Sequence, residues 1–168
     1  MSTVIRPVRA GDGPGRARVW QEAGTFFAAL EPGVLQEPQP DGLVEWHEDL
    51  YERTSADPAT LMLVAETAGE IVGTAVARVH EPLPSARWQL QRDLAHRRVH
   101  VDALAVIGAA RRNGVGAALM SEVERWAVEQ GATVVTLETH LSNPTSMPFY
   151  EQRMGYSPRE VVFRKELR

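Results

Sequence analysis

Residues 104–117 carry the pattern with the clearest chemical meaning, because an apolar strand-like run passes through a glycine-containing turn into a helix-like run. Backbone N–H groups at a helix start lack partners, and together with the helix dipole they favour a phosphate group. Gly114 and Gly116 have no Cβ, so a pyrophosphate can approach the backbone closely, and Arg111 and Arg112 add positive charge. The pattern predicts an anion site, although a plain strand–turn–helix connection with solvated arginines explains the same residues.

Two common nucleotide-binding patterns fit this segment less well. A dinucleotide fold needs Gly-x-Gly-x-x-Gly/Ala, but the sixth position here is Leu119. Glu138 stands near the distance expected for a ribose contact, yet only one strand–helix–strand unit is visible where the dinucleotide fold needs two. A Walker A loop is excluded because no Gly-Lys-Ser/Thr occurs. A nucleotide-binding oxidoreductase is therefore disfavoured.

A third pattern matches better, since Arg111-x-x-Gly114-x-Gly116 resembles the Gln/Arg-x-x-Gly-x-Gly/Ala acyl-CoA signature of the GCN5-related N-acetyltransferase (GNAT) family. The sequence departs from that family at Gly108, where a proline is common, and at Arg112, where a glycine is common. Other blocks resemble the family in the family's order, with weak likeness only at 31–60 and 80–97. These blocks are Ile5-Arg6-Pro7 with Asp12, residues 101–106, Asn143-Pro144, Phe149-Tyr150-Glu151, Gly155-Tyr156 and residues 162–167.

The resemblance implies an acetyl-CoA site on the strand expected at 99–106. In the family this strand and the next one, expected here at 134–139, splay apart, and the pantetheine arm pairs with the strand edge in the gap. A backbone N–H there would polarise the thioester carbonyl. The coenzyme-binding residues that the resemblance implies are Leu104, Ala105, Val106, Arg111, Arg112, Asn113, Gly114, Val115, Gly116, Ala117, Asn143 and Tyr150.

The resemblance also implies a catalytic acid. Tyr150 matches the tyrosine usually proposed to protonate the leaving thiolate, and the alternative is that it packs in an aromatic core. Asn143 precedes it by seven residues, so both would share a face of a helix expected at 143–154. Asn143 would hydrogen-bond the pantetheine, cap that helix, or do both.

The sequence offers several candidates for the catalytic base. Asp102 is the first candidate, since several family members carry a glutamate there, and the alternative is a structural ion pair with Arg97 or Arg98. Glu138 and His140 are reserve candidates, and water could also carry the proton. The five histidines show no metal-ligand spacing on a convincing helix, so we expect no metal.

The acceptor pocket is expected at the first two helices and the loop between them, as in the family. An acidic, aromatic pocket would suit a cationic amine, whereas solvated helix faces are the simpler explanation. The residues concerned are Glu22, Glu31, Glu37, Asp41, Glu45, Glu48 and Asp49, with Trp46 and His47 among them. We predict acetyl transfer from acetyl-CoA to a primary amine of a small molecule or peptide in a ternary complex. The alternative is a non-catalytic acyl-CoA sensor or assembly module of the same fold.

Hydropathy patterns predict the elements that would position these residues. Pro7 places the first strand at a sheet edge. The order β-α-α-β-β-β-α-β-α-β predicts an α/β fold, a single GNAT domain over residues 1–168 with a mixed, mostly antiparallel sheet whose central parallel strands splay apart. Strands are expected at 3–9, 61–67, 71–79, 99–106, 134–139 and 160–166, helices at 12–30, 43–56, 114–130 and 143–154, and an ambiguous insert at 81–96.

Composition narrows the partners. The 168 residues carry a net charge of −4 and contain no cysteine, which excludes disulfides and thiolate metal sites and disfavours nucleic-acid binding. No apolar run is long enough to span a bilayer and the N-terminus lacks a signal-peptide pattern, so we expect a cytoplasmic protein without a membrane partner. Dimerisation is expected only from the family resemblance.

Overall fold

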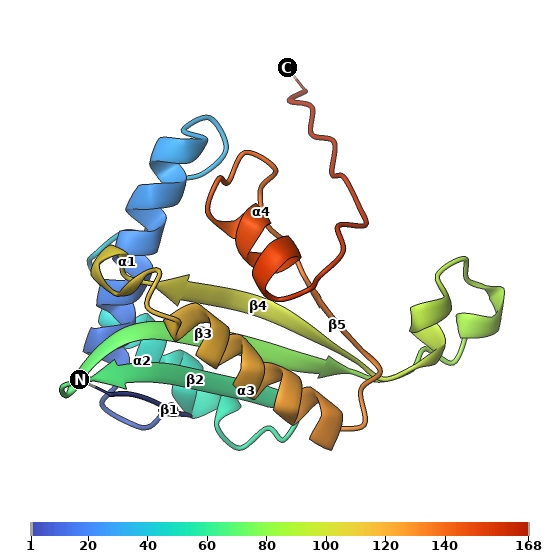
Figure 1. Cartoon of the computed structure of the whole chain (residues 1–168), viewed down its shortest axis with the longest axis horizontal. Coiled ribbons are helices and arrows are strands. Elements are labelled where there is room, and N and C mark those ends of the chain that lie inside the picture. Colours follow the sequence, from blue (N-terminus) through green and yellow to red (C-terminus); the bar gives the residue numbers. More distant parts are fainter. Residues whose placement is uncertain (1, 168) are drawn as a thin grey trace. The chain divides into compact units, whose positions relative to one another are not determined.

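The computed structural model describes residues 2–167 and divides the chain after Glu138 into a larger first unit and a smaller second unit. The first unit contains a five-stranded sheet in the order β1-β2-β3-β4-β5 (Figure 1). Its strands are β1 (Thr3–Pro7), β2 (Thr60–Thr67), β3 (Glu70–His80), β4 (Arg98–Val106) and β5 (Val134–Leu137). All neighbours pair antiparallel except β4 and β5, which are parallel, so the predicted mixed, mostly antiparallel sheet is confirmed.

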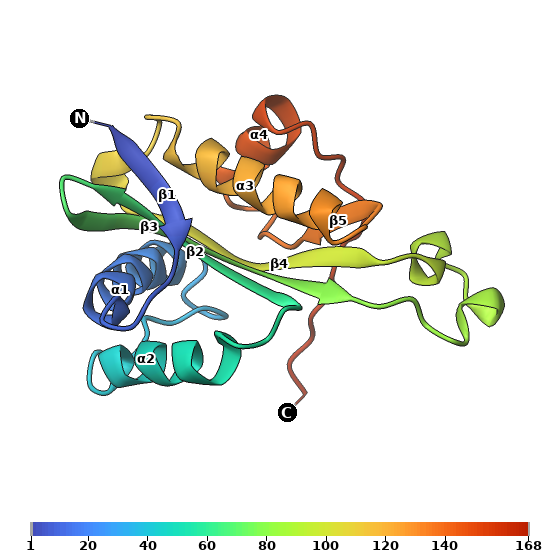
Figure 2. The ribbon, with the colours of Figure 1, turned by 90° about the horizontal axis from the view of Figure 1, so that it is seen from below.

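Three helices cover the two faces of this sheet. Helices α1 (Gly13–Leu30) and α2 (Leu43–Thr54) lie on one face and α3 (Val115–Glu129) on the other (Figure 2). Each helix buries one apolar stripe, as helical periodicity requires. On the α1 side, Val19 and Ala23 join a core cluster with Val64, Val76 and Ala105, and α3 buries Leu119, Met120 and Val123.

The start of α1 is fixed by charges from three elements. The Arg6 guanidinium donates to both carboxylate oxygens of Asp12 at 2.7 and 2.9 Å. The Asp12 side chain makes no hydrogen bond that caps the helix. Instead the Glu48 carboxylate of α2 accepts the N–H groups of Gly11 and Gly13 at 3.3 and 2.7 Å. An acid at this end is stabilised by the helix dipole, and it ties α2 to α1.

The segment between β3 and β4 projects beyond the ends of these strands (Figure 1). It holds two short 3₁₀ turns, Ala86–Trp88 and Arg92–Ala95, which settles the ambiguous reading of 81–96 as turns rather than a regular helix. Arg97 anchors its base by pairing with Glu81 at 2.8 Å and donating to the Gln130 carbonyl at 2.8 Å.

The second unit contains one short helix of mixed type. Helix α4 (Ser146–Pro148) continues into a π-helical turn, Phe149–Arg153, closed by the Met154 N–H on the Phe149 carbonyl at 3.1 Å. The expected regular helix over 143–154 is therefore wrong in extent and type. Pro148 lacks the N–H that a continuing α-helical ladder needs, which favours the wider turn.

The strand expected at 160–166 is also wrong, because residues 157–167 form neither helix nor strand. Val162 and Phe163 are 83% and 93% exposed. Their apolar pattern favours a strand locally, but a strand forms only against a paired edge. The strand expected at 134–139 likewise ends at Leu137. No helix within residues 2–167 is long and apolar enough to cross a membrane.

Candidate functional site

The most distinctive feature of the first unit is a change of pairing along β4 at Asp102. Only the first part of β4 pairs with β5, and the last pair is Val101 with Leu137. On the other side Val76 pairs with Ala103 and Ala77 with Val101, so Asp102 is the extra residue of a β-bulge. In the part of the chain that the structure describes, no strand lies beside 102–106 on the β5 side. A free strand edge of this kind can pair with an extended ligand.

A short turn connects this open edge of β4 to the start of α3. A 3₁₀ turn, Gly108–Ala110, follows β4, and Gly114 then caps α3 with a φ of 83°. No side chain caps this helix end and its first turn holds no acid, so among the described residues its N–H groups face no carboxylate of their own turn. The N–H groups of Val115, Gly116 and Ala117 can therefore bind a phosphate.

Arg112 occupies the position where the signature commonly has a glycine, and its backbone explains that preference. Its φ is 65°, in the left-handed region that glycine adopts without a Cβ penalty. A residue with a Cβ pays roughly 1–2 kcal/mol to adopt this conformation. The turn therefore keeps the shape that a glycine would give it, while adding a positive charge beside the helix start.

Arg111 ties this turn back onto β4. Its Nε donates to the Val106 carbonyl at 2.9 Å, and its guanidinium carbon lies 4.9 Å from the centre of the Phe26 ring on α1. The guanidinium is thus held at the junction of β4, the turn and α1. Its predicted contact with a pyrophosphate stays a prediction.

Asp102 forms a different ion pair from the one expected. Its carboxylate lies 2.8 Å from Nε of Arg78 on the neighbouring β3. Arg97 instead pairs with Glu81, and Arg98 donates to the carbonyls of Asp93 and His96 at 3.3 and 3.4 Å. Asp102 pairs with Arg78 and not with Arg97 or Arg98, because Arg78 on the neighbouring strand lies beside the bulge. The role of Asp102 as a base stays a prediction.

In the second unit, Asn143 holds the turn that leads into α4, two residues before the N-cap Thr145. Its side chain is 1% exposed, and its Oδ1 accepts the N–H groups of Thr145 and Ser146, each at 3.0 Å. Its Nδ2 donates to the Ser146 hydroxyl at 2.7 Å. The capping alternative is confirmed, and the contact with pantetheine stays a prediction. Because Asn143 precedes the helix, the argument that it shares a helix face with Tyr150 does not hold.

Tyr150 lies on the π-helical turn among other aromatic rings. The ring centres of Phe149 and Tyr156 are 5.0 and 5.9 Å from its own, both edge-on. Burial raises the pKa of Tyr150 to about 12, so its phenol is neutral at physiological pH. These ring contacts are the kind that the aromatic-packing alternative expects, and the role of Tyr150 as the catalytic acid stays a prediction.

Comparison with known proteins identifies the family. Residues 22–156, most of the chain, match the acetyltransferase (GNAT) family. The chain belongs to the GNAT family. It is 32% identical over 120 residues to the acetyl transferase GW6a of Oryza sativa subsp. japonica, a match covering 68% of this chain and 28% of that protein. It is 31% identical over 111 residues to the aminoglycoside N(6')-acetyltransferase type 1 of Klebsiella aerogenes, covering 64% of this chain and 68% of that protein.

A solved structure shares the fold of this GNAT chain. It is AAC(6')-Iy in complex with a bisubstrate analog, CoA-S-monomethyl-acetylneamine, with a TM-score of 0.65 and 20% identity. The likeness covers 99% of this chain and 100% of that one. This likeness shows the fold, and the family match shows that the chain is a member of the GNAT acetyltransferases.

Two residues on α1, Glu22 and Phe26, contact the segment after β4 in a way that the sequence did not predict, since Glu22 was expected only in the acidic acceptor region. The Glu22 carboxylate accepts the Gly108 N–H at the end of β4, and Phe26 carries the Arg111 guanidinium on its ring. A signal for Glu22 was present, because Gly108 replaces a common proline and so adds an N–H that needs an acceptor. No such signal pointed to Phe26, since its contact depends on how α1 packs.

Proposed function

We propose that this GNAT protein transfers the acetyl group of acetyl-CoA to a primary amine of a small molecule. One observation carries the proposal most strongly. The unpaired edge of β4 after Asp102 is followed, through the turn at 107–114, by the N-terminus of α3, which no side chain caps. In acetyl-CoA the pantetheine arm, which can pair like a strand, is followed by the pyrophosphate. These two groups have the same order as the strand edge and the helix start that would bind them.

The residues would divide the work along the length of the coenzyme. Backbone of Leu104, Ala105 and Val106 would pair with the pantetheine arm, and an N–H there would polarise the thioester carbonyl. The pyrophosphate would lie on the helix start, with charge from the arginines. The residues proposed for it are Arg111, Arg112, Asn113, Gly114, Val115, Gly116 and Ala117.

The reaction would proceed by direct attack of a neutral amine on the thioester carbon. A C–N bond forms, the C–S bond breaks, and the amine loses one proton to Asp102 or to water. Tyr150 would give its proton to the departing thiolate. We also propose that residues 1–168 form one acetyltransferase domain. A cytoplasmic location and a homodimer stay predictions.

Coenzyme binding is the first test. Thermal melting is recorded with acetyl-CoA, CoA, NAD and ATP in parallel. A ligand at about 100 times its Kd adds roughly 2.7 kcal/mol of stability, a shift of a few degrees at this chain length. Stabilisation by acetyl-CoA and CoA alone supports the site, and stabilisation by NAD instead would overturn it.

Tyr150→Phe then separates an enzyme from an acyl-CoA sensor. For an enzyme, kcat for thiol release should fall by about 10²-fold or more while the affinity for acetyl-CoA is kept. Tyr156→Phe is the matched control, because it removes a hydroxyl from the neighbouring ring. A protein that binds acetyl-CoA but releases no thiol with any amine of a broad panel is a sensor, and the enzyme proposal then fails.

A further inference from the structure

The projecting segment between β3 and β4, residues 81–97, presents apolar and positively charged side chains to solvent. Trp88 is 69% exposed and Leu90 is fully exposed. The guanidinium carbon of Arg87 lies 4.1 Å from the centre of the Trp88 ring, so these two side chains stack. Among the described residues, the one ion pair of the segment lies at its base, so Arg87 and Arg92 have no carboxylate partner. Trp and Arg are the side chains that most often dominate the binding energy of protein interfaces, so this surface has the composition of a contact site.

Backbone hydrogen bonds hold the projecting segment in shape. The Leu83 N–H donates to the Leu94 carbonyl at 2.9 Å and closes the segment into a loop. Inside this loop the Trp88 N–H donates to the Ser85 carbonyl at 2.9 Å, within the first 3₁₀ turn. Because these bonds order the segment before it meets a partner, its association loses less conformational entropy than that of a flexible loop.

Helix α2 presents an acidic stripe on its outer face. Glu45, Asp49 and Glu52 are exposed, and their helical spacing places them along one side of the helix. In the part of the chain that the structure describes, none of these three carboxylates forms an ion pair. Arg53, which is the one Arg or Lys of α2, donates its Nε–H to the Asp49 carbonyl instead. Like charges at this spacing repel, so the stripe destabilises α2 unless a cationic surface covers it.

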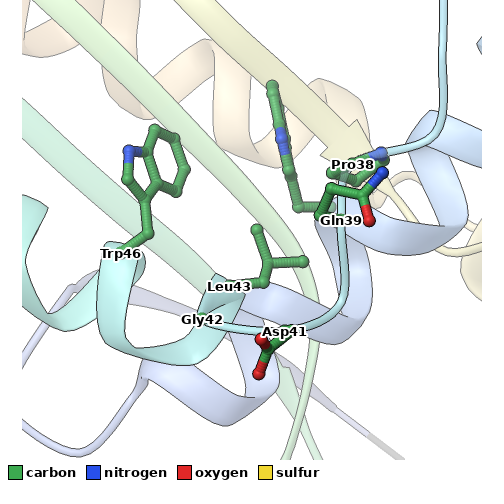
Figure 3. A pocket seen from close by; sticks show the side chains of 7 residues that line it. Pro38, Gln39, Asp41, Gly42, Leu43 and Trp46 are labelled. Atoms are coloured by element: carbon green, nitrogen blue, oxygen red, sulfur yellow. The ribbon is translucent and has the colours of Figure 1, made fainter.

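The opposite side of α2 is buried in the first unit. His47 is 3% exposed, and its ring centre lies 4.8 Å from that of Trp46 and 6.5 Å from that of Trp20. Trp46 precedes Asp49 by three residues, so its indole borders the acidic stripe, and it also lines the pocket beside the loop between α1 and α2 (Figure 3). Because Trp46 is 45% exposed, the stripe has an aromatic edge that a second aromatic side chain can contact.

The two surfaces have opposite charge and do not meet within one chain. Residues 78–98 contain five arginines and two acids, whereas residues 31–52 contain seven acids and no Lys or Arg. Figure 1 and Figure 2 both place the projecting segment beyond one end of β3 and β4, and α2 toward the other end of the sheet. Electrostatic complementarity attracts and orients two protein surfaces. A second copy of the chain can supply the matching surface to each.

We propose that two copies of this chain associate, with the projecting segment of each copy lying on the acidic stripe of the other. Arg87 and Arg92 pair with the acids of the partner's stripe, and Trp88 packs against the partner's Trp46. A two-fold axis relates the copies, so the same contact forms twice and both surfaces of each copy are covered. A contact between two projecting segments would instead bring the unpaired arginines of both copies together, which like charge opposes. The inference is independent of the proposed function.

Charge reversal tests the pairing. Arg87→Glu/Arg92→Glu reverses the projecting segment, and Glu45→Arg/Asp49→Arg reverses the acidic stripe. We expect the wild type to be a dimer at about 100 µM, above the Kd of even a micromolar contact, and each double variant to be a monomer. Sedimentation velocity of the full chain measures the oligomeric state, and circular dichroism checks that each variant is folded.

An equimolar mixture of the two double variants tests whether the two surfaces meet each other. The reversed segment of one variant then faces the reversed stripe of the other, and the unaltered segment faces the unaltered stripe, so both contacts regain opposite charges. The mixture should form a dimer although neither variant does so alone. Arg153→Glu/Arg159→Glu is the matched control, because these two arginines are exposed in the second unit, and it should dimerise like the wild type.

The apolar and ionic parts of the contact can be measured separately. Trp88→Ala should raise the Kd of the dimer by at least about tenfold, as expected for an aromatic side chain at the centre of an interface. Phe163→Ala removes an exposed aromatic ring outside both surfaces and should leave this Kd unchanged. Raising the salt concentration from about 50 mM to about 500 mM should weaken the dimer several-fold, because exposed ion pairs are screened.

Every other pattern overturns the inference. A wild type that stays monomeric at this concentration has no such contact. A dimer that persists in both double variants uses another surface, and one that persists only in Glu45→Arg/Asp49→Arg joins the two projecting segments to each other. A dimer that persists only in Arg87→Glu/Arg92→Glu does not need the projecting segment. Folded variants whose equimolar mixture stays monomeric would show that the segment and the stripe do not meet.

Discussion

His47 is a buried imidazole whose protonation is opposed by the fold. Its pKa is about 4, against an ordinary value of 6.5, because burial and the charge of Arg16 disfavour the imidazolium. As pH falls below 6.5 the unfolded chain takes up this proton before the folded chain does. The stability that His47 contributes is therefore complete above pH 6.5 and is lost as pH falls through 4. The difference corresponds to roughly 3 kcal/mol, measured by urea unfolding between about pH 7.5 and pH 4.

Two variants isolate this effect from general acid unfolding. His47→Phe keeps a ring between the indoles without a titrating group, so its stability should fall less steeply below pH 6.5. His96→Gln removes an exposed histidine on the projecting segment and should follow the wild type. Parallel pH profiles for the wild type and His47→Phe would contradict the assignment.

Arg112 carries a conformational cost that a glycine would relieve. Arg112→Gly should raise the free energy of unfolding by about 0.5–1 kcal/mol. The left-handed φ no longer conflicts with a Cβ, and this gain is larger than the loss caused by the greater flexibility of glycine in the unfolded chain. The same variant should weaken acetyl-CoA binding, because it removes a charge beside the helix start. Thermal melting and coenzyme titration measure the two effects separately.

The conformational origin of that gain has its own controls. Ala68→Gly should also stabilise, because Ala68 has a φ of 52° in the turn between β2 and β3. Ala110→Gly should destabilise, because Ala110 ends a 3₁₀ turn of ordinary backbone and a glycine there only adds flexibility to the unfolded chain. A loss of stability in both Arg112→Gly and Ala68→Gly would refute the argument.

At the scale of elements, the open edge of β4 gives the proposed coenzyme site a direct test. Amide hydrogen exchange within Leu104–Val106 should slow when acetyl-CoA is added, because the pantetheine arm would take up backbone groups that no strand pairs on that side. Amides of Leu63–Ala65 in β2 are the internal control, since both neighbours of that strand are already in place. Unchanged exchange in Leu104–Val106 at saturating acetyl-CoA would place the arm elsewhere.

Elements set by local pattern could be predicted from the sequence, and elements set by distant partners could not. The helices α1, α2 and α3 lie close to their expected ranges because each has an apolar stripe and clear end signals. The strand expected at 160–166 failed because apolar alternation does not supply a paired edge. The helix expected at 143–154 failed because Pro148 has no N–H to bond the carbonyl of Pro144, and the turn that follows it is π-helical.

The candidate site follows the same division. Its glycines and arginines could be predicted because they form a sequence signature, and the capping role of Asn143 could be predicted from the local preference of asparagine. The ion pair between Asp102 and Arg78 could not be predicted, because it depends on the strand register and on a β-bulge. Glu22 and Phe26 reach the end of β4 only through the packing of α1.

At the scale of the whole molecule, stability should reside in the first unit. The core side chains Leu119, Met120 and Val123 of α3 are fully buried, whereas the apolar residues at 161–163 are exposed. Buried leucines lose transfer free energy and leave a cavity when truncated, and exposed side chains do neither.

Leu119→Ala should therefore lower the free energy of unfolding by about 3 kcal/mol, and Phe163→Ala by less than about 0.5 kcal/mol. Urea unfolding of the full chain measures both. The comparison of these two variants also tests whether residues 160–166 are irregular, as in the structure, or form the strand that the sequence predicts. A Phe163 side chain that is 93% exposed has no contacts to lose, whereas a strand at 160–166 would bury it on one face of the sheet. A cost for Phe163→Ala that approaches the cost for Leu119→Ala would restore the sixth strand.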